Sequence, residues 1–184
     1  RHMCGLVGVF DPRQVYTKDS LDRAIDSIGY RGVDERGVER VGPSWMAHVR
    51  LAVVDPKNGH QPMTNADGSV HVIFNGEIYN YRELRADLEA EGFRFRSQSD
   101  TEVLLCAISA WGTKALEQLN GMFAFAVWDK QEQKLLLARD RYGIKPLYYS
   151  ATSNTLAFGS EQKAIFAQPE FLRRLDKEAL LEYF

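Results

Sequence analysis

Cys4 is the first residue whose type and position suggest chemistry. A free cysteine is most often a small buried hydrophobic residue, because thiol reactivity requires a specific microenvironment. Here Met3 directly precedes it. We expect Arg1, His2 and Met3 to be an expression-tag remnant that ends at the initiator methionine, whose removal exposes the α-amine of Cys4. If Arg1 instead belongs to the natural chain, Cys4 has no free amine.

A free α-amine would make Cys4 both nucleophile and base. The amine has a pKa of about 7.7–8.0 and the thiol one of about 8.5, so the amine can accept the thiol proton near neutral pH. A water molecule is expected to relay this proton, since the direct geometry within one residue is poor.

Asn75 and Gly76 follow an apolar segment and precede a helix. Asn-Gly is a common turn dipeptide, which is the simpler interpretation. Alternatively, the Asn75 side-chain amide and the Gly76 backbone N–H form an oxyanion hole, where one donor contributes roughly 3–4 kcal/mol in other enzymes.

Two charged residues suggest recognition of an amino acid. Arg50 is either a solvated charge at a strand end or a bidentate clamp for a carboxylate. Asp100 either complements the dipole of the helix that it begins or accepts a substrate ammonium. Recognition of an α-amino acid requires a partner for its carboxylate and a partner for its amine.

The remaining candidates are interpreted as structural. His48, His60 and His71 match no zinc-ligand spacing, so no metal site is expected. Cys106 lies within an apolar helical pattern and is expected to pack in the core.

The composition is that of a soluble globular protein, with 45% hydrophobic and 26% charged residues among 184. The formal net charge of -2 gives no reason to expect nucleic acid or an acidic membrane as partner. No apolar stretch approaches the roughly 20 residues of a membrane span. Two cysteines are too few for a disulfide framework. We expect one cytoplasmic domain.

The elements that must position these residues are mainly strands. Apolar runs bounded by turn residues predict strands at 4–10, 45–49, 51–54, 70–74, 122–128, 134–139, 146–150 and 156–159. Helical spacing predicts helices from Leu21 to Ile28, from Asn80 to Gly92 and from Ser99 to Gly112, and a last one around Leu180. Asn80 is expected to cap the second helix, and Ser99 with Glu102 to form a capping box at the start of the third. The pattern favours a mixed fold with mainly antiparallel sheets.

Six motifs occur together along the chain. They are Cys4-Gly-Leu-Val-Gly-Val-Phe10, Arg31-Gly32, Asn75-Gly-Glu-Ile-Tyr-Asn80, Ser99-Asp-Thr-Glu102, Gly121-Met-Phe-Ala-Phe-Ala126 and Arg139-Asp-Arg-Tyr-Gly-Ile-Lys-Pro-Leu-Tyr148. In this order they resemble the class II glutamine amidotransferase domain of glutamine-hydrolysing asparagine synthetases. The resemblance implies an α+β fold, the N-terminal nucleophile hydrolase αββα sandwich of two antiparallel sheets.

The resemblance also implies roles for individual residues. Cys4 becomes the nucleophile, with Asn75 and Gly76 as the oxyanion hole, in the hydrolysis of L-glutamine to L-glutamate and ammonia. The implied substrate-binding residues are Arg50 for the α-carboxylate, Asp100 and Glu77 for the α-amine, and Leu51, Val53 and Val54 for the pocket wall.

The resemblance predicts a division of the whole protein. Residues 4–184 would be the glutaminase domain, and 176–184 would begin a linker to a C-terminal ATP-dependent synthetase domain that is absent here. ATP and Mg²⁺ are expected only in that domain, and no cofactor in this one. The ammonia acceptor is aspartate by default, and whether two copies form a homodimer is open.

The chain departs from the family pattern in one loop. Tyr30-Arg-Gly-Val-Asp34 stands where the family usually has His-Arg-Gly-Pro-Asp. Loss of the proline frees the backbone before Asp34. Two other hypotheses remain: a non-catalytic domain that braces a synthetase, and a different N-terminal nucleophile enzyme such as an acylase.

Overall fold

The computed structural model describes residues 4–52, 55 and 58–171. Its strands are β1 (Gly5–Phe10), β2 (Glu35–Val41), β3 (Ser44–Arg50), β4 (Met63–Thr64), β5 (Val70–Ile78), β6 (Gly121–Asp129), β7 (Lys134–Arg139), β8 (Tyr148–Ala151) and β9 (Leu156–Gly159). Its helices are α1 (Lys18–Asp26), α2 (Tyr81–Ala90), α3 (Asp100–Trp111), α4 (Ala115–Gln118) and α5 (Gln162–Phe166), with the 3-10 turns η1 (Gly29–Arg31) and η2 (Gly112–Lys114).

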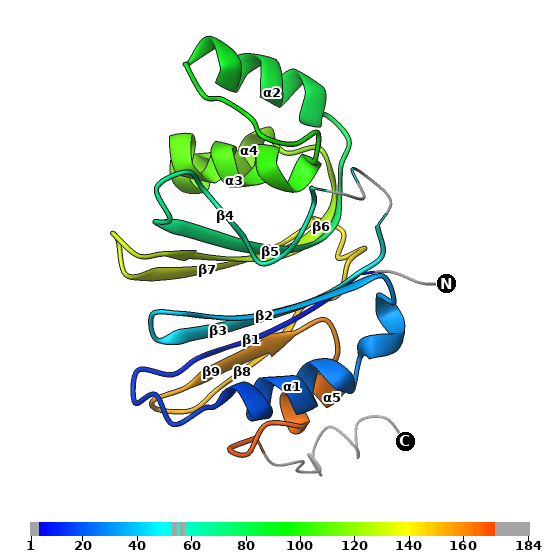
Figure 1. Ribbon diagram of the computed structural model, residues 1–184, viewed down its shortest axis with the longest axis vertical. Coiled ribbons are helices and arrows are strands. Elements are labelled where there is room, and N and C mark those ends of the chain that lie inside the picture. Colours follow the sequence, from blue (N-terminus) through cyan, green and yellow to red (C-terminus); the bar gives the residue numbers. More distant parts are fainter. Residues whose placement is uncertain (1–3, 53–54, 56–57, 172–184) are drawn as a thin grey trace.

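Two antiparallel sheets lie face to face between layers of helices (Figure 1). The first sheet has the strand order β2-β3-β1-β9-β8, and the second has the order β4-β5-β6-β7. Helices α1 and α5 cover the outer face of the first sheet, and α2, α3 and α4 lie outside the second. The layering is the αββα sandwich that the sequence resemblance implied.

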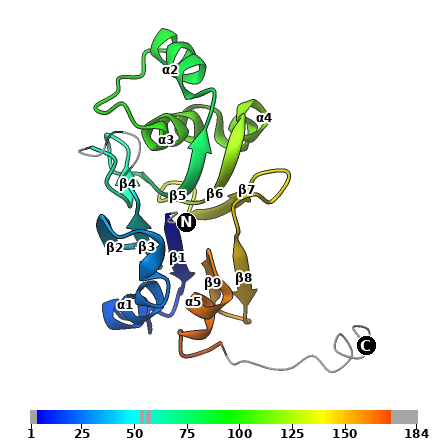
Figure 2. The same cartoon turned by 90° about the vertical axis from the view of Figure 1, so that its right-hand side faces the viewer.

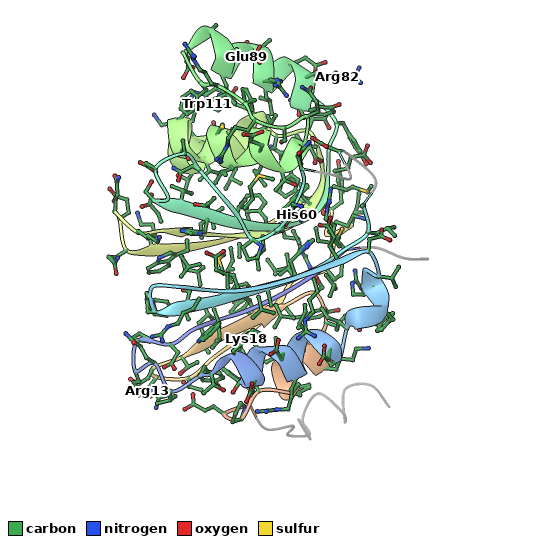
Figure 3. The ribbon with its side chains drawn as sticks, viewed as in Figure 1. Arg13, Lys18, His60, Arg82, Glu89 and Trp111 are labelled. Carbon is green, nitrogen blue, oxygen red and sulfur yellow. The ribbon has the colours of Figure 1, made fainter. Side chains whose placement is uncertain are left out.

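Side chains pack into three hydrophobic clusters, one between the sheets and one under each helical layer (Figure 3). The strands separate these clusters by the alternation of their side chains. On β5, Val72 and Phe74 pack towards α3, whereas Ile73 faces the other sheet. The inter-sheet cluster consists of Leu6, Val41, Met46, Ile73, Ala124, Ala126, Trp128 and Phe158.

The connection from β7 to β8 passes from the second sheet to the first (Figure 2). It follows Arg139 and precedes Tyr148. The segment therefore joins the two halves of the sandwich, and the last of the sequence motifs forms it.

Most predicted elements are confirmed, including β7 and β9 at their predicted bounds. The strand predicted at 51–54 is wrong at its first two residues, because Leu51 and Ala52 belong to no strand. Val53 and Val54 lie outside the described residues, as does the helix predicted around Leu180. The sequence pattern missed β2, a charged strand that pairs only with β3 and forms the sheet edge.

The helix that begins after Asn80 is confirmed, but Asn80 does not cap it through its side chain. Its Nδ2 donates to the carbonyl of Gln118 at 2.9 Å, and its Oδ1 accepts from the N–H of Asn120 at 3.0 Å. Asn80 thus ties the start of α2 to the segment that leads into β6.

The capping box predicted at Ser99 and Glu102 is also wrong in part. Ser99 Oγ does cap α3, accepting from the N–H of Thr101 at 3.1 Å. The Glu102 carboxylate instead accepts from the N–H groups of Arg96 and Ser97, at 2.9 and 2.7 Å. Because the chain folds back before Ser99, this buried carboxylate holds the incoming loop rather than the cap residue.

No helix in the described ranges is long and apolar enough to cross a membrane.

Candidate functional site

A cavity of about 170 Å³ lies where the start of β1, the ends of β3 and β5 and the first turn of α3 meet. Seven predicted site residues line it: Cys4, Arg50, Leu51, Asn75, Gly76, Glu77 and Asp100. Its other lining residues are Gln61, Phe74, Ser99, Thr101, Met122 and Lys145. The two further predicted residues, Val53 and Val54, fall outside the described part of the chain.

Strand alternation brings Cys4 to this cavity. Leu6 points between the sheets, and Cys4, two residues earlier, lies on the same side of the chain. The N–H of Leu51 donates to Cys4 Sγ at 3.3 Å, and Cys4 Sγ donates to the Leu51 carbonyl oxygen at 3.7 Å. The Cys4 carbonyl accepts from Arg31 Nε at 3.1 Å. The thiol and the backbone carbonyl of Cys4 are therefore both hydrogen-bonded.

Opposing influences act on the Cys4 thiol. Burial is the largest and raises its pKa above the ordinary value. The hydrogen bond from Leu51 and the positive charges of Arg50 and Lys145 lower the pKa. The result is a raised pKa, so the thiol form predominates at neutral pH and a base is needed to ionise it.

Asn75 lies two residues after Ile73 and faces the other sheet by the same alternation. It pairs with Ala124, and Gly76 pairs with Phe123, within the ladder of β5 and β6. The interpretation of Asn-Gly as a plain turn is therefore wrong. Asn75 is buried, and no described residue accepts a hydrogen bond from its Nδ2. An amide donor in this state is rare in folded proteins, since its desolvation costs about 1–3 kcal/mol.

Gly76 is required by its surroundings. Its φ is +157°, which L-residues with side chains rarely adopt. A Cβ atom here would lie 2.1 Å from the carbonyl oxygen of Met122 on β6. The absence of a side chain therefore allows β6 to approach β5 closely at this position.

Two polar side chains hold the residue before Asn75. The Phe74 carbonyl accepts from His48 Nε2 at 2.9 Å, and its N–H donates to Gln61 Oε1 at 2.6 Å. Burial lowers the pKa of His48 to about 3. His48 is thus neutral at physiological pH, with its proton on Nε2, and links β3 to β5 across the sandwich.

Arg50 ends β3 on the same side of the strand as Met46 and His48. Its guanidinium is buried, with Nη1 3.1 Å from Glu35 Oε2 and Nη2 2.8 Å from the Asp55 carbonyl oxygen. The alternative of a solvated surface charge is therefore wrong. Since Arg50 also lines the cavity, its fork can receive an anionic group there.

Asp100 is the first residue of α3, so its position favours negative charge. Its Oδ2 accepts from the N–H of Ile78 at 3.1 Å. Burial nevertheless raises the pKa of Asp100 to about 6, and the nearby charge of Glu77 also raises it. A buried carboxylate of this kind gains from a cationic ligand in the cavity.

The loop that departs from the family pattern contacts the site. Arg31 holds the Cys4 carbonyl and forms an ion pair with Glu161 at 2.9 Å. The Asp34 carboxylate accepts from the N–H of Ala52 at 2.8 Å. Tyr30 is exposed and donates to Glu161 at 2.5 Å. The loop thus packs against both Cys4 and the segment that follows Arg50.

The residues interpreted as structural lie away from the cavity lining. Cys106 is buried in the cluster beneath α3, as predicted. His71 is buried, with its Nε2 3.2 Å from the Gly68 carbonyl oxygen. His60 is exposed and contacts Glu35 at 3.1 Å (Figure 3). Among the described residues, no group of three or more His, Cys, Asp and Glu could hold a metal ion.

Sequence reasoning missed Lys145 and Gln61. Lys145 belongs to a motif that marked the family resemblance, but a lysine in a polar turn has the pattern of a surface charge. Gln61 lies in a segment with no helical or strand periodicity. Both positions depend on contacts between segments far apart in the sequence, which no local pattern reports.

Comparisons with known proteins agree on one family. The model of the glutamine amidotransferase domain family matches residues 3–184. Glutamine-hydrolyzing asparagine synthetase 3 of Bacillus subtilis is 42% identical over 186 residues, covering 99% of this chain and 30% of the relative. Amidase chyE of Penicillium rubens is 38% identical over 160 residues, covering 85% of this chain and 24% of the relative. The chain therefore spans less than a third of the length of these relatives.

A solved structure supports the fold independently. Glutamine phosphoribosylpyrophosphate amidotransferase from B. subtilis superposes with a TM-score of 0.73 at 22% sequence identity. The match covers 89% of this chain and 43% of that chain. The sandwich is the N-terminal nucleophile hydrolase fold, and the chain belongs to the glutamine amidotransferase domain family, with glutamine-hydrolysing asparagine synthetases among its relatives.

Proposed function

We propose that this domain hydrolyses the side-chain amide of L-glutamine to L-glutamate and ammonia, with Cys4 as nucleophile. The observation that carries the proposal is the Asn75 amide. Its Nδ2 is buried without an acceptor among the described residues, and Asn75 lines the same cavity as Cys4. A preorganised donor next to a thiol is the arrangement that stabilises an oxyanion formed by thiolate attack.

Two charged groups supply recognition of the amino-acid end. The Arg50 fork binds the α-carboxylate, and Asp100 together with Glu77 receives the α-ammonium. Leu51, Val53 and Val54 complete the wall of the pocket in this proposal. Binding of the ammonium favours the ionised form of Asp100 and offsets the effect of burial on its pKa.

The chemistry proceeds through a thioester. The Cys4 α-amine takes the thiol proton, through a water molecule, as Sγ bonds to the amide carbon. The carbonyl electrons move to oxygen, where Asn75 Nδ2 and the Gly76 N–H stabilise the negative charge. The oxyanion then collapses, the C–N bond breaks, and the α-ammonium returns the proton to the leaving nitrogen, which departs as ammonia. Water then attacks the thioester carbon while the α-amine takes one of its protons. The C–S bond breaks and glutamate is released, and the proton passes from the α-ammonium to Cys4 Sγ, which regenerates the thiol.

This mechanism requires a free α-amine on Cys4. If residues 1–3 stay attached, the nitrogen of Cys4 is part of an amide and has no basicity. Such a preparation is expected to be nearly inactive.

The ammonia is proposed to serve an ATP-dependent asparagine synthetase-type domain in the full-length protein. This proposal is supported by relatives that carry that name and are more than three times as long as the matched region. ATP and Mg²⁺ would act only in that domain. Aspartate is the first acceptor to test, with other acids beside it.

A glutaminase assay of protein that begins at Cys4 tests the proposal. Cys4→Ala is expected to abolish glutamate release, whereas Cys106→Ala, which alters the other cysteine in a separate cluster, retains it. Activity unchanged in Cys4→Ala would refute a nucleophilic role. A parent without glutaminase activity would support the alternative of a bracing domain, and an Arg50→Ala variant with the parental KM for glutamine would support a different acyl substrate.

A further inference from the structure

The connection between β7 and β8 is organised by one buried carboxylate. Asp140 Oδ1 accepts from the N–H groups of Tyr142 and Ile144 at 3.1 and 2.9 Å. Asp140 Oδ2 accepts from the N–H groups of Lys145 and Phe123 at 2.9 and 3.2 Å. These bonds lower the pKa of Asp140 despite its burial, so it is ionised at neutral pH. The turn around this carboxylate has a defined shape.

That shape places successive side chains in opposite environments. Tyr142 is 91% exposed and Ile144 is 56% exposed, whereas Lys145 is only 7% exposed. Lys145 lines the same cavity as Cys4. Lysine is among the residue types that are almost never buried without a specific interaction. The turn thus places a buried lysine in the lining of the cavity that contains Cys4.

Several positive charges act on Cys4. Arg31 contacts the Cys4 carbonyl, while Arg50 and Lys145 exert positive fields on its thiol. Arg50 shares its charge with Glu35 at 3.1 Å. The acidic groups Glu77 and Asp100 line the same cavity. Lys145 adds a second positive field to that of Arg50 at the thiol.

We propose that Lys145 is a positioning residue whose ammonium stabilises the Cys4 thiolate, and that the Asp140 turn exists to place it. This inference extends the proposed glutaminase function. Only the expected effect of Lys145 on glutamine turnover rests on that proposed function. When the thiol proton moves to the α-amine, the negative charge on sulfur forms in the positive field of Lys145. The cation favours the state that attacks the amide.

Alkylation of Cys4 by iodoacetamide as a function of pH tests the inference without requiring glutamine turnover. The comparison uses a Cys106→Ala background, with intact mass as the readout, and the variants Lys145→Met, Lys145→Arg and Tyr142→Ala. Lys145→Met is expected to shift the alkylation profile upward by about 1 pH unit, which lowers the rate near pH 7 about tenfold. Lys145→Arg keeps the charge and is expected to stay near the parent profile.

The Tyr142→Ala variant removes an exposed side chain from the same turn and is expected to leave the profile unchanged. A circular dichroism melt identifies folded variants, and Asp140→Asn, which weakens the turn without altering Lys145 itself, should shift the profile in the same direction as Lys145→Met. An unshifted profile in folded Lys145→Met would overturn the inference. Glutaminase activity that is lost in Cys106→Ala, or retained in Cys4→Ala, would contradict the proposed function. Neither result would change the conclusion about Lys145 drawn from the alkylation profile.

Discussion

His48 on the first sheet donates a hydrogen bond of 2.9 Å to the carbonyl of Phe74 on the second. Phe74 immediately precedes Asn75, whose amide Nδ2 has no described acceptor. Because His48 lies two residues before Arg50 on one face of β3, a single strand supports both the proposed oxyanion hole and the proposed carboxylate clamp. The histidine is therefore part of the frame that sets Asn75 relative to Cys4.

Removal of this bridge is expected to reduce both stability and turnover. His48→Ala deletes the Nε2 donor, leaves the buried Phe74 carbonyl without it and opens a cavity, so we expect a loss of about 2–4 kcal/mol in the free energy of unfolding. Turnover should fall while KM for glutamine changes less, because Asn75 is displaced. Urea unfolding and steady-state kinetics measure these effects.

His60→Ala is the control, since His60 is exposed. This substitution should change the free energy of unfolding by less than about 0.5 kcal/mol. Equal effects of His48→Ala and His60→Ala would contradict the bridging role of His48.

Asn75→Ala is expected to lower kcat by about 10²–10³-fold, because one oxyanion donor is lost. KM should stay within a few-fold of the parent, since the donor acts on the transition state. Steady-state kinetics of protein that begins at Cys4 give both parameters. A variant that loses affinity but keeps kcat would place Asn75 in ground-state binding instead.

Arg50→Lys retains a positive charge but removes the planar fork. We expect KM for glutamine to rise at least roughly tenfold with a smaller change in kcat, because a bidentate charge-assisted pair is lost. Competition by glutamate and by glutaramate, which has the carboxylate but lacks the α-amine, shows whether the lost affinity is for the α-carboxylate. Parental KM in this variant would show that the α-carboxylate is bound elsewhere.

Asp100→Asn is expected to stabilise the free domain at pH 7.5 while weakening glutamine binding. The folded-state pKa of about 6 lies above the ordinary 3.8, so protonated Asp100 supports the fold at low pH. This contribution is lost as the pH rises through about 6, which leaves a buried charge at pH 7.5. The neutral amide avoids that charge, and we expect a gain of about 1–3 kcal/mol.

Urea unfolding at pH 7.5 and at pH 4 checks this prediction, since the advantage of Asp100→Asn should shrink at the lower pH. KM for glutamine should rise in the same variant. A variant that is less stable than the parent at pH 7.5 would show that the bond to Ile78 outweighs the burial of the charge.

The sequence predicted the strands well where turns bound an apolar run, as at β7 and β9. It missed β2, because four charged residues on an edge strand conceal the alternation. Asn80 and Glu102 were misread as cap residues, since a local motif cannot show that a distant segment, at Asn120, or a folded-back loop, at Ser97, takes up their side chains.

The site was predictable as residue types but not as an arrangement. Cys4, Arg50, Asn75 and Asp100 each had a plain structural alternative, and the family resemblance carried their grouping. The cavity brings them together through the alternation on three strands and the start of α3. Lys145 was not predictable, since its burial is visible only once distant segments have formed the cavity that it lines.

The most direct measurement compares glutamate release by two forms of the protein whose N-termini are verified by intact mass. One form begins at Cys4 and the other retains Arg1, His2 and Met3. We expect activity in the first form and nearly none in the second, because only the first has a basic α-amine on its nucleophile. Equal activity in both forms would contradict the claim that Cys4 supplies its own base.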